Sequence, residues 1–122
     1  MSAAERAQGA VGTRFRLHGR GSDGLGCVGL AGLAYDVAVP TGYRLRSGDL
    51  GAVERFVAEV GLVAVADARA GDLIAMASGP GQLHLGITTD LGFVHADASL
   101  RRVVERPGAP PWPVLGRWRK GD

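Results

Sequence analysis

The stretch Gly24-Leu25-Gly26-Cys27-Val28-Gly29-Leu30-Ala31-Gly32-Leu33-Ala34-Tyr35 decides the fold, because a glycine-rich segment ends there and an apolar segment begins. Upstream of Cys27, glycine is too frequent for a helix or a regular strand. From Val28 to Tyr35 the residues are apolar on nearly every side, which is typical of a buried helix of about ten residues. The only cysteine of the chain, Cys27, is therefore expected in the first turn of an inner helix.

The predicted position of Cys27 favours reactivity of its thiol. Free backbone amides and the positive end of the helix dipole both stabilise a thiolate at the start of a helix. The sequence therefore predicts a thiol pKa below that of a free cysteine, as in nucleophilic cysteines. A free cysteine is also often a small buried apolar residue, so the position of Cys27 alone leaves both interpretations open.

Length and composition indicate one soluble domain over residues 1–122. Glycine accounts for 20 of the 122 residues, which points to many turns and a loop-rich α+β or β-rich domain. A net charge of +2, from 14 basic and 12 acidic residues, is too balanced for a dedicated nucleic-acid binder. The basic residues near the C-terminus form either a solvated surface or a site for an anionic partner.

The compartment is constrained by three further features of the sequence. One cysteine cannot form an internal disulfide, so folding needs no oxidising compartment. Residues 1–10 lack the basic-then-apolar layout of a signal peptide, and the longest apolar runs are too short to span a membrane. We therefore expect a protein that is made in the cytoplasm and does not insert into membranes.

Helical patterns occupy the first half of the chain and strand patterns the second. The capping box Ser2-Ala3-Ala4-Glu5 predicts a short helix, and an apolar stripe over Leu50–Val60, closed by Gly61, predicts a longer one. Short strands are expected at residues 62–66, 73–77, 83–89, 92–96, 103–105 and 114–119. This order predicts an α+β fold with N-terminal helices packed on an antiparallel sheet of about five to six short strands.

Two of the three histidines, His84 and His95, lie on predicted strands on either side of the turn at Asp90–Gly92. If this turn centres on Asp90-Leu91, the two are near cross-strand partners with side chains on one face of the sheet. Such a pair is compatible with a structural role, with a zinc site that includes Cys27, or with catalysis. No fourth ligand or paired ligand spacing supports a closed structural zinc site.

The hypothesis that uses all three side chains is a catalytic triad. Cys27 is then the nucleophile, His84 takes the thiol proton and later protonates the leaving amine, and His95 orients His84. Backbone amides at the start of the cysteine helix would bind the developing oxyanion.

Five segments, taken in order, resemble the NlpC-type cell-wall cysteine peptidases. They are Gly12-Thr13-Arg14-Phe15, Gly24-Leu25-Gly26-Cys27-Val28-Gly29-Leu30, Ala70-Gly71-Asp72-Leu73, His84-Leu85-Gly86-Ile87 and Gly92-Phe93-Val94-His95-Ala96. The resemblance covers nearly the whole chain and implies a papain-like α+β fold and no cofactor or metal. It implies cleavage of stem-peptide amide bonds in bacterial peptidoglycan, with Cys27, His84 and His95 at the catalytic positions.

The short chain, Leu85 and the ending from Val103 to Trp118 look like the branch of this family found in the tail modules of phages and gene-transfer agents. That likeness implies that a phage-like tail carries the enzyme to the cell wall, with tail-tip proteins as partners. We expect no nucleic-acid partner and no insertion of the protein into a membrane.

The chain departs from the family pattern at four positions. Arg14 and Phe15 stand where many members have proline and tyrosine, while Gly26 and Val28 replace the common aspartate and serine beside the cysteine. These changes leave the triad intact but affect the oxyanion side and the substrate contacts. His18, in the loop before the cysteine, is a candidate for substrate contact and otherwise an ordinary loop residue.

Two other functions fit the same residues. A structural or binding component of a tail tip, with a weak or inactive catalytic apparatus, would explain the four departures. An acyltransferase on the same scaffold would pass the acyl group to an amine acceptor instead of water.

Overall fold

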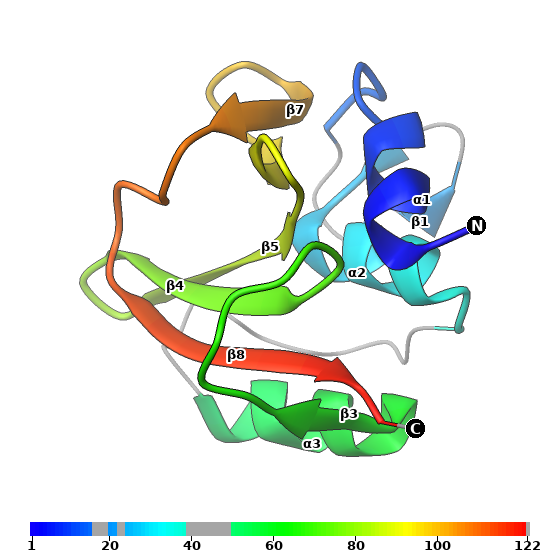
Figure 1. The fold of residues 1–122 in the computed structure, drawn as a ribbon. Helices are drawn as coiled ribbons and strands as arrows, with labels where there is room; N and C mark the ends of the chain where they lie inside the picture. The colour runs from blue at the N-terminus through cyan, green and yellow to red at the C-terminus, as the bar shows by residue number, and fades with distance from the viewer. Residues whose placement is uncertain (16–19, 22–23, 39–49, 122) are drawn as a thin grey trace.

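The computed structural model describes residues 1–15, 20–21, 24–38 and 50–121, which contain three helices and eight strands. Their bounds are α1 Ala3–Gly9, β1 Arg20–Gly21, β2 Gly24–Leu25, α2 Cys27–Tyr35, α3 Leu50–Val60, β3 Leu62–Ala64, β4 Leu73–Gly79, β5 Gln82–Thr88, β6 Gly92–Asp97, β7 Arg102–Pro107 and β8 Val114–Lys120. Six strands form an antiparallel sheet in the order β3-β8-β4-β5-β6-β7 (Figure 1). The predicted α+β class is confirmed.

The helices begin and end at the residues that the sequence indicates. Ser2 and Glu5 form the predicted capping box, in which the Glu5 amide donates to Ser2 Oγ at 3.1 Å and the Ser2 amide donates to Glu5 Oε1 at 3.0 Å. Cys27 is the first residue of α2, as expected. Gly61 ends α3 with a φ of +86°, a conformation that glycine adopts without strain.

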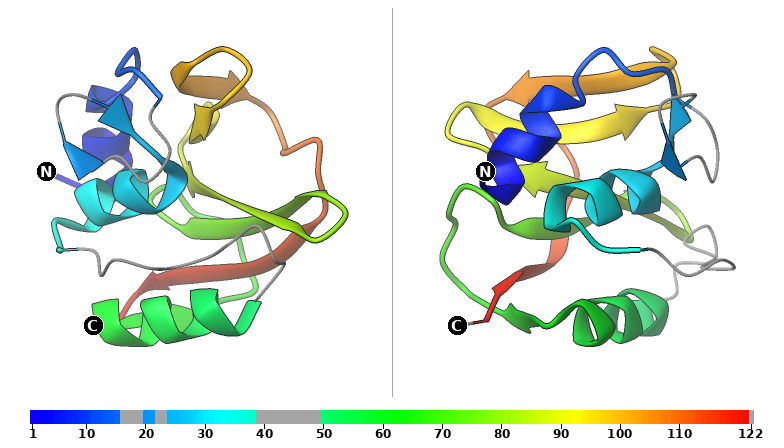
Figure 2. Two further views of the ribbon diagram at one scale, coloured as in Figure 1. Left: turned by 180° about the vertical axis from the view of Figure 1, so that it is seen from behind. Right: turned by 90° about the vertical axis from the view of Figure 1, so that its right-hand side faces the viewer.

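All three helices pack against one face of the large sheet. Figures 1 and 2 show α1 and α2 next to each other near β5, with α3 beside β3. One hydrophobic core joins them to the strands, and its larger members include Leu30, Tyr35, Val53, Phe56, Leu73, Leu85, Ile87, Val94, Val103 and Trp118. A second, smaller cluster of Ile74, Met76, Phe93 and Trp112 lies on the opposite face, because side chains alternate between the two faces along β4.

Two features of the strands differ from the expectation. The glycine-rich segment before Cys27, expected to contain no regular strand, includes the two-residue antiparallel pair β1–β2. The last strand, β8, does not simply close a meander but inserts between β3 and β4. Its Trp118 is buried and lies opposite both Ala64 and Leu73, so β8 joins two strands that are not paired with each other.

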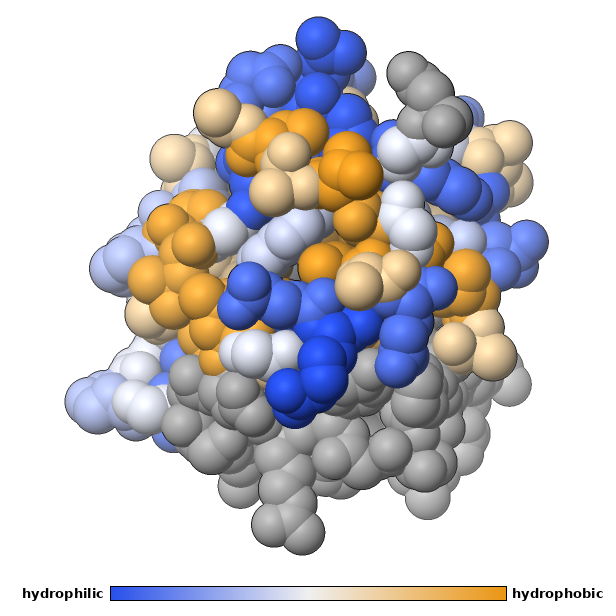
Figure 3. Space-filling model, turned by 90° about the horizontal axis from the view of Figure 1, so that it is seen from below, coloured by the Kyte–Doolittle hydropathy of each residue, from blue (hydrophilic) through white to orange (hydrophobic). Residues whose placement is uncertain are grey.

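The surface carries scattered apolar residues. Figure 3 shows apolar patches interrupted by hydrophilic side chains on the face seen from below. Exposed large hydrophobic residues among those described include Val63, Leu91, Leu100, Val114 and Leu115. Single exposed side chains of this kind are normal for folded proteins. None of the helices in the described ranges has the length and apolar character needed to cross a membrane.

Candidate active site

Cys27 is the first residue of α2. The preceding residue, Gly26, is the N-cap in an extended conformation, and its carbonyl accepts the amide of Leu30 at 2.9 Å. Gly26 has no side chain that could occupy the free amides of the first turn. Cys27 itself is partly buried and packs against the main core, and the Leu85 backbone on β5 is among the groups that act on the pKa of its thiol.

The Leu85 amide is available because β5 and β6 separate. The Thr88 amide donates to the Asp72 carbonyl at 2.8 Å on the β4 side, and amides along a strand point alternately to its two neighbours. The Leu85 amide therefore points toward β6. Pairing between these two fully described strands consists of Ile87 with Val94 and Thr88 with Phe93. At Leu85, β5 and β6 are therefore no longer paired.

Burial raises the pKa of the Cys27 thiol, although hydrogen bonds from the backbone amides of Leu85, Val28 and Cys27 itself act in the opposite direction. The lowered thiol pKa predicted from the sequence is therefore wrong for this structure. The helix end does present its amides, but the loss of hydration raises the thiol pKa by more than hydrogen bonds from these amides lower it.

His84 and His95 meet where β5 and β6 are no longer paired. The pairing of Ile87 with Val94 places the turn centre between Asp90 and Leu91, as predicted, so the two histidines are diagonal neighbours on one face of the sheet. His84 Nε2 and His95 Nδ1 are 2.8 Å apart, within hydrogen-bond distance. The two rings are nearly perpendicular, with centroids 5.0 Å apart. The structure thus brings together the two histidines that the sequence singles out.

Gly86, the third residue of the His-Leu-Gly-Ile segment, leaves room for this arrangement. A Cβ atom at Gly86 would lie 3.2 Å from the Val94 carbonyl oxygen and 3.3 Å from the Phe93 ring. These distances are shorter than ordinary van der Waals contacts. A glycine therefore lets the Phe93 ring pack beneath His95, where the two ring centroids are 5.0 Å apart.

Both imidazoles are neutral at pH 7. Burial lowers the pKa of His84 to about 4, and the neighbouring His95 adds to this effect while Asp97 opposes it. Burial also lowers the pKa of His95, against the carboxylate of Asp97 and with the help of the Arg106 guanidinium. Together with the raised pKa of the Cys27 thiol, these shifts describe a resting site of neutral groups.

The neutral resting state predicts the pH dependence of thiol alkylation. Only the thiolate reacts with iodoacetamide, so we expect Cys27 to react slowly at pH 7 and faster as the pH rises above the ordinary thiol range. The rate constant should be measured against pH by mass spectrometry, with the urea-unfolded chain as the reference for an unperturbed thiol. A rate that is already maximal below pH 7 in the folded protein would contradict the neutral state.

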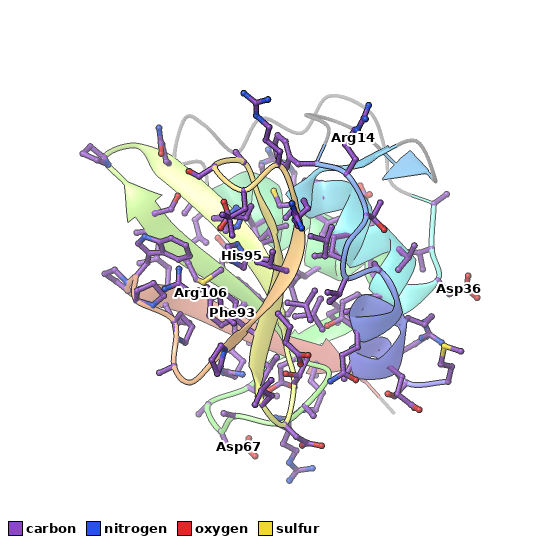
Figure 4. The ribbon with its side chains drawn as sticks, turned by 90° about the horizontal axis from the view of Figure 1, so that it is seen from above. Arg14, Asp36, Asp67, Phe93, His95 and Arg106 are labelled. Atoms are coloured by element: carbon purple, nitrogen blue, oxygen red, sulfur yellow. The ribbon has the colours of Figure 1, made fainter. Side chains whose placement is uncertain are left out.

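Trp112 covers the imidazole pair. Its ring centroid lies 5.8 Å from those of both His84 and His95, and the Arg106 guanidinium lies over the Trp112 ring, 5.6 Å from its centroid. Figure 4 shows Phe93, His95 and Arg106 gathered in one region of the sheet. Trp112 was not among the residues expected at the site from the sequence. Its position in the proline-rich segment between two strands was the signal that could have identified it.

Truncation of Trp112 should raise the pKa of His84. Burial is the main cause of the low value of about 4, so Trp112→Ala admits water and should raise this pKa by about one unit or more. The measurement is an NMR titration of the histidine ring protons. Trp112→Phe, which keeps an aromatic cover, serves as the control and should shift the pKa less. An unchanged pKa of His84 in Trp112→Ala would show that other residues exclude water from the two imidazoles.

The other residues that the sequence singled out near the site lie outside the histidine pair. Arg14 is exposed and forms an isolated β-bridge with Arg102, while Phe15 packs against the main core. Val28 also packs against that core, and His18 lies outside the described residues.

The triad hypothesis requires Cys27 to lie within hydrogen-bond reach of His84. In the ranges that the structure describes, no hydrogen bond joins Cys27 to His84 or His95. In the same ranges, no group of three or more His, Cys, Asp or Glu side chains is placed to hold a metal ion. Cys27 packs against the main core, which includes Leu85, the residue after His84.

The sequence matches no family model and no curated protein. Among solved structures, NlpC1 from Trichomonas vaginalis has a TM-score of 0.70 at 23% identity, over 97% of this chain and 44% of that one. NlpC2 from the same organism has a TM-score of 0.68 at 23% identity, over 96% of this chain and 46% of that one. The NlpC/p60 domain of the peptidoglycan hydrolase SagA has a TM-score of 0.58 at 23% identity, over 87% and 86% of the two chains.

The chain spans less than half the length of the two Trichomonas vaginalis proteins that it matches. Identities of 23% establish a common fold and nothing beyond it. This chain therefore has the α+β fold of NlpC/p60 domain proteins.

Proposed function

We propose that this chain is a cysteine hydrolase that cleaves stem-peptide amide bonds of bacterial peptidoglycan. Cys27 is the nucleophile, His84 the general base and acid, and His95 the residue that orients His84. The observation that carries the proposal is the 2.8 Å contact between His84 Nε2 and His95 Nδ1. One similar structure is a domain of a protein described as a peptidoglycan hydrolase, which supports the substrate class.

The contact between the histidines identifies the base atom. Because His84 Nε2 is engaged with His95, Nδ1 is the ring nitrogen of His84 that remains to accept a proton. The thiol proton passes to Nδ1 as the sulfur forms a bond with the carbonyl carbon of the substrate. The same proton then leaves with the amine when the C–N bond breaks, and water hydrolyses the thioester.

The resting state sets a requirement on substrate binding. With the thiol pKa raised and the pKa of His84 at about 4, the neutral thiol and imidazole are favoured over the ion pair in the free protein. A bound substrate must bring the thiol and the imidazole within hydrogen-bond reach, since catalytic contacts often tighten only in the complex. Backbone amides at the first turn of α2, beside Gly26, would then bind the oxyanion.

A second candidate function is a structural or binding component of a tail tip with an inactive catalytic apparatus. The raised pKa of the Cys27 thiol favours it, because an inert buried thiol shows the same property. In both cases we propose that a phage-like tail carries the protein, which is made in the cytoplasm, to the cell wall. Mass spectrometry of purified tail particles from producing cells would test this carriage.

The test of the hydrolase is digestion of purified sacculi by the full chain, with the products analysed by mass spectrometry. We expect muropeptides in which one water has been added and one new amine and carboxylate have formed for each bond cut. The position of the new amine identifies the cleaved bond. Intact muropeptides, together with binding of the chain to sacculi, would favour the structural candidate instead.

A further inference from the structure

One buried ring nitrogen at the site has no partner. His95 is 1% exposed, and its Nδ1 is used by the contact with His84. Its Nε2 is buried and has no hydrogen-bond partner among the residues that the structure describes. An unpaired buried polar atom is costly, so its surroundings should contain the group that it serves.

Asp97 is the group that faces this nitrogen. It lies two residues after His95 on β6, so both side chains project from the same face of the sheet. Asp97 Oδ2 is 3.9 Å from His95 Nε2, and the side chain of Asp97 is only 17% exposed. The other oxygen, Oδ1, accepts the amide of Leu100 at 3.0 Å, which leaves Oδ2 for His95.

We propose that Asp97 is a positioning residue that sets the tautomers of both imidazoles by accepting the Nε2 proton of His95. This inference rests on the proposed hydrolase, because it concerns the base of that reaction. A rotation of the Asp97 side chain that moves Oδ2 toward His95 would turn the 3.9 Å separation into an N–H···O hydrogen bond. His95 Nδ1 is then an acceptor, His84 Nε2 must carry a proton to donate to it, and His84 Nδ1 is left with a free lone pair.

The reverse order of protons would block the reaction. If His95 carried its proton on Nδ1, it would donate to His84 Nε2, and His84 would carry its own proton on Nδ1. That nitrogen could not accept the thiol proton. Two neutral imidazoles can adopt either arrangement of tautomers. A third group that only accepts hydrogen bonds is therefore needed to select one of them. A carboxylate meets this condition, and it remains ionised while it holds the imidazole, as in serine peptidase triads.

The other charged group near the pair argues for the same assignment. Arg106 on β7 acts on His95 through its positive charge and only donates hydrogen bonds, so it cannot accept the Nε2 proton. The Asp97 carboxylate opposes Arg106 at His95 and also acts on His84. An imidazolium formed at His84 during the reaction would therefore be stabilised by Asp97.

The tautomers can be observed directly by NMR of the full chain labelled with ¹⁵N-histidine at neutral pH. We expect the proton on Nε2 in both His84 and His95. The matched pair of variants is Asp97→Ser, whose hydroxyl can still accept the Leu100 amide, and Asp90→Ser, which removes an exposed carboxylate from the turn of the same hairpin. Asp97→Ser should yield a mixture of tautomers, and Asp90→Ser the pattern of the parent protein.

Hydrolysis of sacculi supplies the second readout. We expect Asp97→Ser to reduce the rate about 10-fold or more, and Asp90→Ser to leave it unchanged. A proton on Nδ1 of His95 in the parent protein, or an unchanged tautomer pattern in Asp97→Ser, would overturn the inference. Because the NMR result does not depend on activity, an inactive parent protein with the expected tautomers would refute the hydrolase and leave the assignment of Asp97 standing.

Discussion

Cys27→Ala is expected to reduce the hydrolysis of sacculi to the level of the buffer control, a loss of about 10³-fold or more. The reason is that no other side chain at the site can form the acyl intermediate, and the imidazole pair alone would have to activate water. Alanine fits the partly buried position of Cys27 and should leave the fold intact. The measurement is the rate of release of soluble muropeptides, with circular dichroism as the check on folding.

Variants of the two histidines complete this experiment. His84→Ala should abolish activity in the same way, because the thiol then has no base. His95→Ala should cost less, since an orienting residue contributes less than the nucleophile and the base. If Cys27→Ala digests sacculi as fast as the parent protein, the hydrolase proposal is wrong. Equal effects of His84→Ala and His95→Ala would instead mean that the two imidazoles act as one unit.

Asp72→Asn is expected to destabilise the fold by about 3 kcal/mol. Asp72 is 0% exposed and accepts hydrogen bonds from Arg117 at 3.1 Å and from Arg119 at 2.8 and 3.0 Å. The amide of Arg69 also donates to it at 2.8 Å. Removal of the negative charge leaves two arginines without their buried partner. The free energy of unfolding, measured by urea denaturation, should fall accordingly.

The pH dependence of stability provides an independent check on Asp72. Burial raises the pKa of this carboxyl, but hydrogen bonds from Arg119, the Arg69 amide and Arg117 outweigh it and lower the pKa below its ordinary value. The contribution of Asp72 to stability is therefore complete above its ordinary pKa and is lost as the pH falls through the lowered value. Asp72→Asn should accordingly lose less stability on acidification than the parent protein.

Asp67→Asn is the matched control for Asp72→Asn. Asp67 also pairs with Arg69 and Arg119, but its side chain is 61% exposed. Surface ion pairs contribute little, so we expect a change below about 1 kcal/mol in the same urea experiment. If Asp67→Asn costs as much as Asp72→Asn, burial is not the reason for the importance of Asp72.

This ion-pair network also bears on the site. Arg117 donates to Thr88 at the end of β5 as well as to Asp72, so it ties β8 to the strand that carries His84. The Tyr35 hydroxyl donates to the carbonyl of Gly71 at 2.6 Å and thereby joins the end of α2 to the turn before β4. Loss of the contacts of Arg117 should therefore loosen β5, the strand that carries His84.

Local patterns in the sequence were sufficient for the elements that bear the site. The capping box at Ser2, the apolar run after Cys27 and the glycine at position 61 specify helix ends through contacts within a few residues. The turn at Asp90-Leu91 sets the hairpin register by itself, and the register places His84 and His95 on one face. The α+β class and the contact between the two histidines follow from these local features.

What the tertiary structure alone decided depends on residues far apart in the chain. The direction of the thiol pKa comes from burial of Cys27 against β5, more than fifty positions later, and no local pattern reports it. The insertion of β8 between β3 and β4, and the pairing of Asp72 with Arg117 and Arg119 some 45 positions away, arise only when the sheet assembles. Desolvation and long-range pairing are properties of the packed molecule, whereas helix ends and hairpin registers are properties of short segments.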